Sequence, residues 1–404
     1  MFANTAYIRA VVQIYCFFVY FKKKTPQYAE GERESVKMKQ NYKVGIIGAT
    51  GMVGQRFITL LNDHPWYTIE VLAASPRSAG KKYKDAVGAK WAMDTEIPES
   101  VADMVVMDAT GDVEKIAEKV DFVFCAVDMK KDEIKALEEK YAKCECPVVS
   151  NNSAHRHTPD VPMIIPEINP EHIEIIPSQR KRLGTKRGFV AVKSNCSLQS
   201  YLPALAVINE KYPIDHALVT TYQAISGAGK TFKTWPEMVD NLIPYIGGEE
   251  MKSEVEPNKI LGKIENGEIV PSNELQIECQ TYRVPVSNGH TAAIFFTFKD
   301  GVKKPSVEEM EKMWAEYSGE PQKLNLPHAP KQFIHVFTEK DQPDQPQIKT
   351  AREVDGGMAI SCGRLRESVQ YDYKMVSMSH NTLRGAAGGA VLLAELLTAK
   401  GYMD

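Results

Sequence analysis

The sequence predicts an α/β protein whose first half forms a doubly wound parallel sheet and whose second half forms an α+β domain. Three observations lead to this prediction. Short apolar runs alternate with helical patterns between residues 43 and 150, as in parallel strands joined by crossover helices. A glycine-rich turn follows the first of these runs. After Cys196 the pattern changes to strands of alternating polarity, proline-rich loops and isolated helices.

Length and composition are those of a globular protein with more than one core. The 404 residues are 43% apolar and 25% charged, and the net charge of -3 disfavours nucleic acid as the main partner. Seven cysteines without a regular framework indicate a reducing compartment, so we expect a cytoplasmic protein. Cys144 and Cys146 have one residue between them and no matching second pair, so no metal site is predicted.

The N-terminal segment differs from the rest of the chain. Its apolar run at residues 10–21 is broken only by Gln13 and is followed by three lysines. The run is too short to span a bilayer, and the basic cluster follows it instead of preceding it, which disfavours a signal peptide. We therefore expect residues 1–40 to be a disordered leader outside the fold, and no membrane association.

A glycine motif opens the first domain. A predicted strand at residues 43–47 runs into Gly48-Ala-Thr-Gly-Met-Val-Gly54, and a helical pattern follows at residues 55–61. Glycines in this context let the backbone approach a pyrophosphate at a helix N-terminus, as in Rossmann-type domains. The spacing differs from the commoner G-x-G-x-x-G, and a bare structural turn is the alternative. The context favours a dinucleotide site formed by Gly48, Thr50, Gly51, Met52, Val53 and Gly54.

The loop after the second predicted strand, at residues 68–73, bears on the choice of cofactor. It carries Ser75, Arg77 and Ser78 and lacks the acidic residue that usually meets a free ribose 2′-hydroxyl. Hydroxyl donors and a cation suit a 2′-phosphate, so the loop favours NADP over the alternative of a solvated basic loop.

Further strands and a crossover helix complete the predicted parallel sheet. Residues 121–128 and 147–150 are typical of buried strands, and residues 131–143 of a helix; Cys125 is most simply a core residue. A polar loop with Arg156 follows the later strand, at the strand end where ligands of such sheets bind. Arg156 either holds an anion there or is an ordinary surface charge.

Cys196 lies in the polar turn Ser194-Asn-Cys-Ser-Leu-Gln199, between an apolar run and a helical segment at residues 201–210. Unpaired amides and the helix dipole at such a position favour a thiolate, which makes Cys196 a candidate nucleophile. A small buried hydrophobe is an equally good interpretation of the turn alone.

The second half contains the remaining predicted elements. A strand at residues 217–221 leads into a glycine-rich turn that lacks the spacing of a nucleotide-hydrolysing loop. Two strands, at residues 275–286 and 291–298, are predicted to form a hairpin through Ser287-Asn-Gly289, with Cys279 facing the core. A helix at residues 306–317, a strand at residues 332–338 and a final helix at residues 381–399 follow. Asn381 is placed to cap that helix or to face a ligand.

Six motifs, taken together, resemble the aspartate-semialdehyde dehydrogenases, and most closely the branch found in archaea and fungi. The resemblance covers about residues 41–404 and excludes the leader. The motifs occur in the order of the family and are Gly48-Ala-Thr-Gly-Met-Val-Gly54, Ser194-Asn-Cys-Ser197, Tyr222-Gln-Ala-Ile-Ser-Gly-Ala-Gly229, Ile243-Pro-Tyr-Ile-Gly-Gly-Glu-Glu250, Arg283-Val-Pro-Val-Ser-Asn-Gly-His290 and Asn381-Thr-Leu-Arg-Gly-Ala-Ala-Gly388.

The resemblance implies catalytic roles. Cys196 would attack the substrate carbonyl and His290 would act as general acid and base, a role suited to imidazole. Gln223 would orient the bound intermediate, and Arg283 would bind the substrate carboxylate through its planar fork. Seven residues separate Arg283 from His290, but the intervening turn resets the alternation of strand faces.

The resemblance also implies substrate and cofactor contacts. Glu249 or Glu250 would meet the substrate ammonium, and we favour Glu249, which stands three residues before Lys252. Lys193, two residues before Asn195, departs from the pattern expected ahead of the cysteine. Two further sets are implied: a phosphate subsite of Lys252, Arg156 and Asn195, and cofactor contacts from Ser226, Gly227 and Asn381.

The implied reaction is the reversible, NADPH-dependent conversion of L-aspartyl 4-phosphate to L-aspartate 4-semialdehyde and inorganic phosphate through a cysteine thioester. It belongs to the synthesis of threonine, methionine, isoleucine and lysine. The implied domains are an NADP-binding domain of residues 41–195 with 380–404 and a catalytic and dimerisation domain of residues 196–379, in a homodimer or homotetramer. A malonyl-CoA reductase on the same scaffold and a non-catalytic NADP-binding protein are the alternatives.

Overall fold

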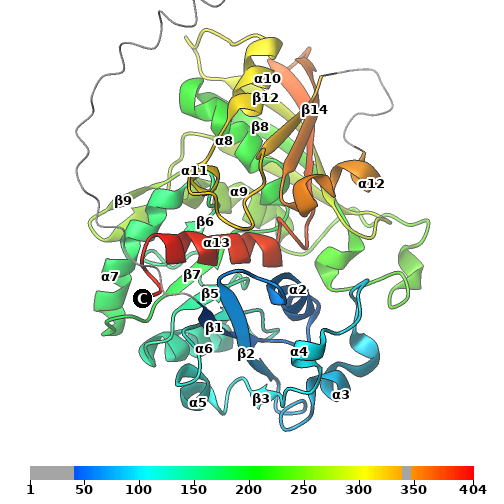
Figure 1. Cartoon of the computed structure of the whole chain (residues 1–404). Coiled ribbons are helices and arrows are strands. Elements are labelled where there is room, and N and C mark those ends of the chain that lie inside the picture. Colours follow the sequence, from blue (N-terminus) through cyan, green and yellow to red (C-terminus); the bar gives the residue numbers. More distant parts are fainter. Residues whose placement is uncertain (1–40, 339–346) are drawn as a thin grey trace, which may run out of the picture. The chain divides into compact units, whose positions relative to one another are not determined.

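The computed structural model describes residues 41–338 and 347–404 (Figure 1). The expected leader, with its apolar run at residues 10–21, lies outside the described residues. No helix among the described residues is long and apolar enough to cross a membrane.

The first sheet has seven strands in the order β3-β2-β1-β4-β5-β7-β6, and every neighbouring pair is parallel. This arrangement confirms the predicted doubly wound sheet. The strand order reverses between β1 and β4, and such switch points form the ligand crevice of this architecture. The strands are β1 (Tyr42–Ile47), β2 (Tyr67–Ala74), β3 (Met107–Asp108), β4 (Phe122–Cys125), β5 (Val148–Ser150), β6 (Met163–Ile164) and β7 (Val190–Lys193).

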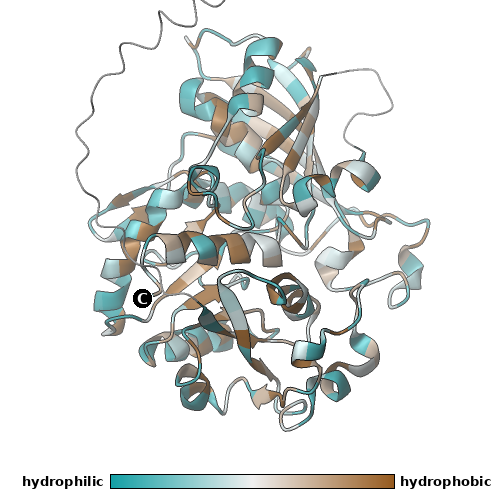
Figure 2. Cartoon of the chain, in the orientation of Figure 1, coloured by the Kyte–Doolittle hydropathy of each residue, from teal (hydrophilic) through white to brown (hydrophobic). Residues whose placement is uncertain are grey.

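Helices cover this sheet, and the last helix of the chain, α13 (Ala387–Ala399), returns to pack against α2, β5 and β7. Apolar residues lie all around α13, as expected for a buried helix (Figure 2). The prediction that this helix starts at residue 381 is wrong. Its N-cap is Ala386, because the side chain of Asn381 bonds to other loops and residues 381–386 form a turn. The other helices packed with this half of the chain are α2 (Met52–Leu61), α3 (Tyr83–Val87), α4 (Glu99–Ala102), α5 (Val113–Ala117), α6 (Lys131–Lys143) and α7 (Ile176–Leu183).

The second sheet has six strands in the order β11-β8-β12-β15-β14-β13. Helices α8 and α10 pack on it, and α9 packs along β11. Its strands are β8 (Ile214–Gln223), β11 (Gln276–Arg283), β12 (His290–Phe298), β13 (Ile334–Phe337), β14 (Ile360–Glu367) and β15 (Tyr373–Ser379). The remaining elements are α8 (Leu202–Lys211), α9 (Glu249–Ile260), α10 (Val307–Glu316), α11 (Glu320–Lys323), α12 (Ile348–Ala351), the pair β9 (Lys263–Glu265) and β10 (Glu268–Val270), and the 3₁₀ turns η1 (Gly88–Lys90), η2 (Pro170–Ile175), η3 (Leu198–Ser200), η4 (Ile225–Ala228), η5 (Pro236–Met238) and η6 (Val354–Gly357).

The predicted hairpin between β11 and β12 is wrong. Strand β8 lies between them, parallel to β11 and antiparallel to β12. The connecting residues pass over the end of β8, where the N–H of Val284 donates to the Gln223 carbonyl and the N–H of Ile225 donates to the Val286 carbonyl. Alternating polarity predicts which face of a strand is buried, but it does not predict which strand is the neighbour in the sheet. Cys125 and Cys279 are buried in the core, as predicted.

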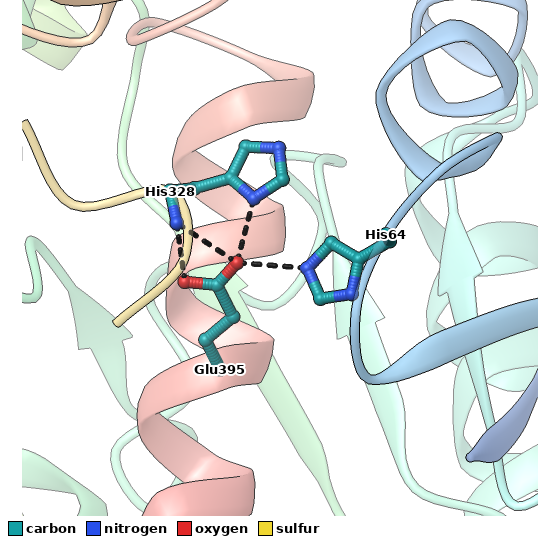
Figure 3. A group of neighbouring side chains, drawn as sticks. All are labelled: His64, His328 and Glu395. Atoms are coloured by element: carbon teal, nitrogen blue, oxygen red, sulfur yellow. Dashed lines mark hydrogen bonds and ion pairs between the residues drawn. The ribbon is translucent and has the colours of Figure 1, made fainter. Parts of the chain in front are cut away.

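A buried network of two histidines and a glutamate ties the loop after α11 to α13 (Figure 3). Glu395 accepts from Nε2 of His64 at 2.9 Å and from Nδ1 of His328 at 2.6 Å. Nδ1 of His64 accepts from the N–H groups of Trp66 and Tyr67, so Nε2 carries the ring proton. A metal ion would need the Nε2 lone pair, so the group forms a hydrogen-bonded network instead of a metal site.

Candidate active site

A cavity of about 480 Å³ lies at the carboxyl ends of the parallel strands. Val53 lines it after β1, Asp128 after β4, Asn152 after β5 and Cys196 after β7, and Asn381 closes it from the C-terminal segment. Loops of this kind meet at one edge of a parallel sheet, because all the strands point the same way. The cavity therefore occupies the expected ligand-binding position.

Cys196 lines this cavity and lies beside the buried His290, although 94 residues separate the two in the chain. Cys196 lies in the turn between β7 and η3, and His290 is the first residue of β12. The Cys196 Sγ atom is 3.4 Å from Nε2 of His290. This distance lies within hydrogen-bond reach for sulfur, so the pair can exchange a proton.

The electrostatics of this pair differ from the expectation. Burial raises the pKa of the Cys196 thiol and Glu249 raises it further, while the cations Lys193, Arg156 and Arg283 act in the opposite direction. Burial also lowers the pKa of His290 to about 3, aided by Arg283. The prediction of a thiolate favoured at a helix start is therefore wrong, because lost hydration outweighs the local dipole.

The backbone orients the His290 ring. The Ala224 N–H donates to Nδ1 at 3.1 Å, which turns Nε2 toward Cys196. A hydrogen bond with the Gly289 backbone raises the His290 pKa and so opposes the effect of burial. While Nδ1 accepts from Ala224, the neutral ring carries its proton on Nε2 and donates it toward Sγ. To take up the thiol proton at Nε2 the ring must adopt the other tautomer, in which Nδ1–H donates to the Gly289 backbone, the contact that also favours the protonated ring.

Three polar side chains form one row across the second sheet. In the strand register Gln223 is directly opposite Arg283 on one side and His290 on the other. Directly opposed residues project from the same face of a sheet. The sheet thus presents a guanidinium, an amide and an imidazole side by side, and Arg283 is fixed by donating to the Ala224 carbonyl at 2.7 Å.

Glu249 faces the turn that carries Asn195 and Cys196, whereas Glu250 faces β11. Glu249 accepts from Nδ2 of Asn195 at 2.9 Å and pairs with Lys252 at 2.6 Å. Glu250 instead accepts from the N–H of Thr281, on β11. Of the doubled glutamates, the first is the one that reaches Asn195, next to the candidate nucleophile.

Arg156 is 5% exposed, so the interpretation as a surface charge is wrong. Its Nη1 pairs with Glu256 at 2.9 Å, and its Nε donates to the Lys193 carbonyl at 3.2 Å. Glu256 also accepts from the Asn195 N–H at 2.9 Å. The sequence analysis missed Glu256, although its position seven residues after Glu249 puts both on one face of α9.

A second buried contact set supports the Cys196 turn from behind. Arg384 is fully buried, pairs with Glu167 at 2.6 Å and donates from Nε to Gln199 at 3.0 Å. Gln199 in turn donates to Ser194 Oγ at 2.8 Å. Sequence reasoning placed Arg384 only within a motif and gave it no role.

The glycine motif fits a dinucleotide. Gly48 has φ +97°, and a Cβ there would be 2.3 Å from the Ala126 carbonyl oxygen. A Cβ on Gly54 would be 2.3 Å from the Gly48 oxygen, so these two glycines allow the tight strand–helix turn. A Cβ on Gly51 would meet only one atom, at 3.4 Å, which leaves the α2 N-terminus open to a phosphate group.

Two family models and several relatives match the chain. The model for the semialdehyde dehydrogenase NAD-binding domain matches residues 43–176, and that for the semialdehyde dehydrogenase dimerisation domain matches residues 205–384. The aspartate-semialdehyde dehydrogenase of Candida albicans is 43% identical over 368 residues, which is 89% of this chain and 98% of the relative. The enzyme of that name from Methanothermobacter thermautotrophicus is 41% identical over 360 residues, or 88% of this chain and 98% of the relative.

The chain belongs to the aspartate-semialdehyde dehydrogenase family. Solved structures agree. The Candida albicans enzyme crystallised with NADP matches with a TM-score of 0.80 and 40% identity, over 90% of this chain and all of the other. Aspartate-semialdehyde dehydrogenase II of Vibrio cholerae, in complex with ASA, matches with a TM-score of 0.65 and 25% identity, over 89% of this chain and 98% of that one. The resemblance predicted from the six motifs is confirmed.

The other predicted cofactor residues of this family member fall into two groups. Ser226, Gly227 and Asn381 line the cavity that contains Cys196, together with Met52 and Val53. Asn381 donates to Ser226 Oγ at 2.9 Å and accepts from the Gly289 N–H at 2.7 Å, so it joins two loops of the site. The second group follows β2 at the far end of the crevice, where Ser75 and Arg77 are exposed and Ser78 is half-buried.

Proposed function

We propose that this protein is an NADPH-dependent aspartate-semialdehyde dehydrogenase that converts L-aspartyl 4-phosphate to L-aspartate 4-semialdehyde and phosphate, reversibly, in the synthesis of threonine, methionine, isoleucine and lysine. The observation that carries the proposal is the Cys196–His290 pair, with Sγ 3.4 Å from Nε2, in which Cys196 lines a cavity at the carboxyl edge of the parallel sheet. Membership of the family supports the choice of substrate.

Cys196 is the proposed nucleophile and His290 its proton partner. In the forward reaction the sulfur attacks the acyl carbon, the bond to phosphate breaks, and a thioester forms. His290, in the tautomer whose Nδ1–H donates to the Gly289 backbone, takes up the thiol proton at Nε2 and later protonates the oxygen of the hemithioacetal. NADPH, when bound, would supply the hydride that reduces the thioester to the hemithioacetal. Collapse of the hemithioacetal would then break the C–S bond and release the aldehyde and the Cys196 thiol. Gln223, next to His290 in the sheet, is the proposed donor that orients the intermediate.

Charged residues around the pair suit the proposed substrate. Arg283 is the proposed contact of the α-carboxylate, which matches its planar fork. Glu249 is the proposed contact of the ammonium group; burial acts to raise its pKa, but Lys252 and Asn195 outweigh burial and hold the carboxyl ionised. Arg156, Lys252 and Asn195 are the proposed contacts of the phosphate group.

The residues that would hold NADP surround the crevice of the parallel sheet. The turn from Gly48 to Gly54, with Thr50, Gly51, Met52 and Val53, is the proposed pyrophosphate contact. Ser75, Arg77 and Ser78 are proposed to meet the 2′-phosphate, since an exposed cation and hydroxyls there suit a dianion. Ser226, Gly227 and Asn381 are the proposed contacts at the nicotinamide end.

The proposed domains are residues 41–195 with 380–404 for NADP and residues 196–379 for catalysis and dimerisation. The packing of α13 on β5 and β7 supports the return of the C-terminal segment to the first domain. A homodimer or homotetramer is proposed through the outer face of the second sheet, where Tyr222 is 38% exposed and stacks on Tyr282. The free cysteines of the described part of the chain support a reducing compartment, and we propose the cytoplasm.

The test is phosphate-dependent reduction of NADP with aspartate semialdehyde, measured beside the same assay with malonate semialdehyde and coenzyme A. We expect activity only with the first set. The Cys196→Ala variant should lose turnover and still bind NADPH, measured by fluorescence titration. Substantial turnover in that variant would refute the role of Cys196, and a preference for the coenzyme A reaction would favour a malonyl-CoA reductase.

A further inference from the structure

Three buried or half-buried cations line the cavity beside Cys196, and they differ in their partners. Arg156 pairs with Glu256 at 2.9 Å, and Lys252 pairs with Glu249 at 2.6 Å. Lys193 has no carboxylate within ion-pair distance among residues 41–338 and 347–404. Two of the cations are therefore neutralised by carboxylates of α9, and the third is not.

The ammonium group of Lys193 lies in an unusual environment. Lys193 is the last residue of β7 and is 2% exposed, and its ammonium group makes one hydrogen bond, to the Ser194 carbonyl. An ammonium has three donors, so two remain for a ligand in the cavity that Lys193 lines. A buried charge without a counter-ion is costly, and burial, reinforced by Arg156, lowers the Lys193 pKa to about 7.

We propose that Lys193 is an anion-binding residue of the active site, whose ammonium group pairs with the phosphate that the reaction releases or takes up. The inference rests on the proposed function, because phosphate is the anion of that reaction. Lys193 lies three residues before the nucleophile and on the Arg156 side of the cavity, where Arg156 donates to its carbonyl. A phosphate dianion at this position would be the negatively charged partner that the Lys193 ammonium group lacks among the described residues.

The pairing has a measurable consequence in protons. The charged groups that act on Lys193 are Arg156 and Arg384, which lower its pKa, and Cys196 and Glu256, which raise it. Near pH 8 a lysine with a pKa of about 7 is mostly neutral, and a bound dianion favours its protonated form. Phosphate binding at pH 8 should thus take up a proton, up to about one per site.

The experiment compares two variants and one control in the full chain. Lys193→Met removes the charge and the donor at similar volume, whereas Lys193→Gln removes the charge and keeps a donor for the Ser194 carbonyl. Lys115→Met, at a lysine whose side chain is 72% exposed on α5, changes the net charge equally outside the cavity. NADP binding by fluorescence confirms that each variant is folded.

We expect both Lys193 variants to raise KM for phosphate by tenfold or more, to change KM for NADP by less than threefold, and to abolish proton uptake measured by calorimetry in buffers of different ionisation enthalpy. The control should match the wild type. A normal KM for phosphate in Lys193→Gln with a defect only in Lys193→Met would assign Lys193 to the Ser194 carbonyl alone and overturn the proposal.

A third outcome concerns the thiolate. If both variants keep the wild-type KM for phosphate but shift the pH profile of Cys196 alkylation upward, the role of Lys193 is to lower the thiol pKa. That result would also overturn the proposal. Failure of the proposed function is distinguishable, since the wild type would then lack semialdehyde activity. Calorimetric titration with inorganic phosphate would still compare wild type and variants in that case.

Discussion

Replacing Gly227 by alanine tests how tightly the proposed catalytic side chains are packed. Gly227 lies in η4, and a Cβ built on it would be 2.8 Å from Nη1 of Arg283 and 3.2 Å from Nε2 of His290. Favourable contacts between such atoms are about 3.5 Å, so Arg283 would have to move by roughly 0.7 Å. Arg283 is held by its 2.7 Å bond to the Ala224 carbonyl, which resists that movement.

The magnitude follows from this displacement. A misplacement of about 1 Å at an active site can cost about 10²-fold in rate. We therefore expect Gly227→Ala to lower kcat/KM for aspartate semialdehyde by about 10- to 100-fold, or about 1.4 to 2.7 kcal/mol. The Gly227 backbone lies outside the left-handed region, so Tm should change by less than about 2 °C.

Gly229→Ala is the matched control, in the same turn. Gly229 has φ +67°, and a Cβ there would meet no atom within 4 Å. Alanine should thus cost about 1–2 kcal/mol of stability through backbone strain and leave kcat/KM within threefold. The assay is NADP reduction followed by absorbance, with Tm measured by calorimetry. Unchanged kcat/KM in Gly227→Ala, or an equal loss in both variants, would refute the steric argument.

Three further outcomes are expected. Glu249→Gln should raise KM for aspartate semialdehyde by about 10- to 150-fold, since a charged hydrogen bond contributes about 1.5–3 kcal/mol. Glu250→Gln should raise it less than threefold, and equal effects would contradict the assignment of Glu249 to the ammonium. Arg77→Ala should reduce the preference for NADP over NAD about tenfold, as measured by the ratio of the two kcat/KM values, and an unchanged ratio would remove Arg77 from the 2′-phosphate site. His290 has a folded pKa of about 3, below its ordinary value, so the folded state binds fewer protons and stability falls as pH drops below about 6.5. At pH 5.5 this histidine should cost about 1.4 kcal/mol, and chemical denaturation should show a shallower fall between pH 7.5 and 5.5 in His290→Gln than in the wild type.

Local patterns were sufficient for the longer central strands of the first domain, whereas the two-residue strands β3 and β6 were not predicted. Predicted strands at residues 43–47 and 147–150 correspond to β1 and β5, and the predicted helix at residues 131–143 is α6. Apolar runs that are buried on both faces have few alternatives, and a glycine turn between a strand and a helix fixes the local geometry. These features depend on residues that are close together in the chain, so they can be predicted from one sequence.

The order of strands in the second sheet depends on distant contacts. Alternation predicted β11 and β12 as strands, but it gave no sign that β8 lies between them. That insertion is what aligns Arg283, Gln223 and His290 in one row. The motifs identified these three residues. Their alignment in one row depends on how β8 pairs with β11 and β12 along its whole length.

Burial accounts for the other differences. Glu256 and Lys193 were not assigned as site residues because nothing local distinguishes a buried charged residue from an exposed one. The Cys196 pKa was expected to fall from the position of the turn, whereas enclosure by two domains raises it. Desolvation depends on the complete fold, so the direction of a pKa shift is the property of a site that is hardest to predict from sequence.

The charges around Cys196 connect the proposed substrate contacts to the state of the thiol. Among the charged groups, Glu249 is the one that raises the Cys196 pKa, and it is paired with Lys252. In the proposed complex the substrate ammonium becomes an additional partner of Glu249, which lessens its effect on the sulfur and releases Lys252 toward the phosphate. On the proposed assignment, a ligand with both a cation and an anion would therefore lower the Cys196 pKa and favour the thiolate.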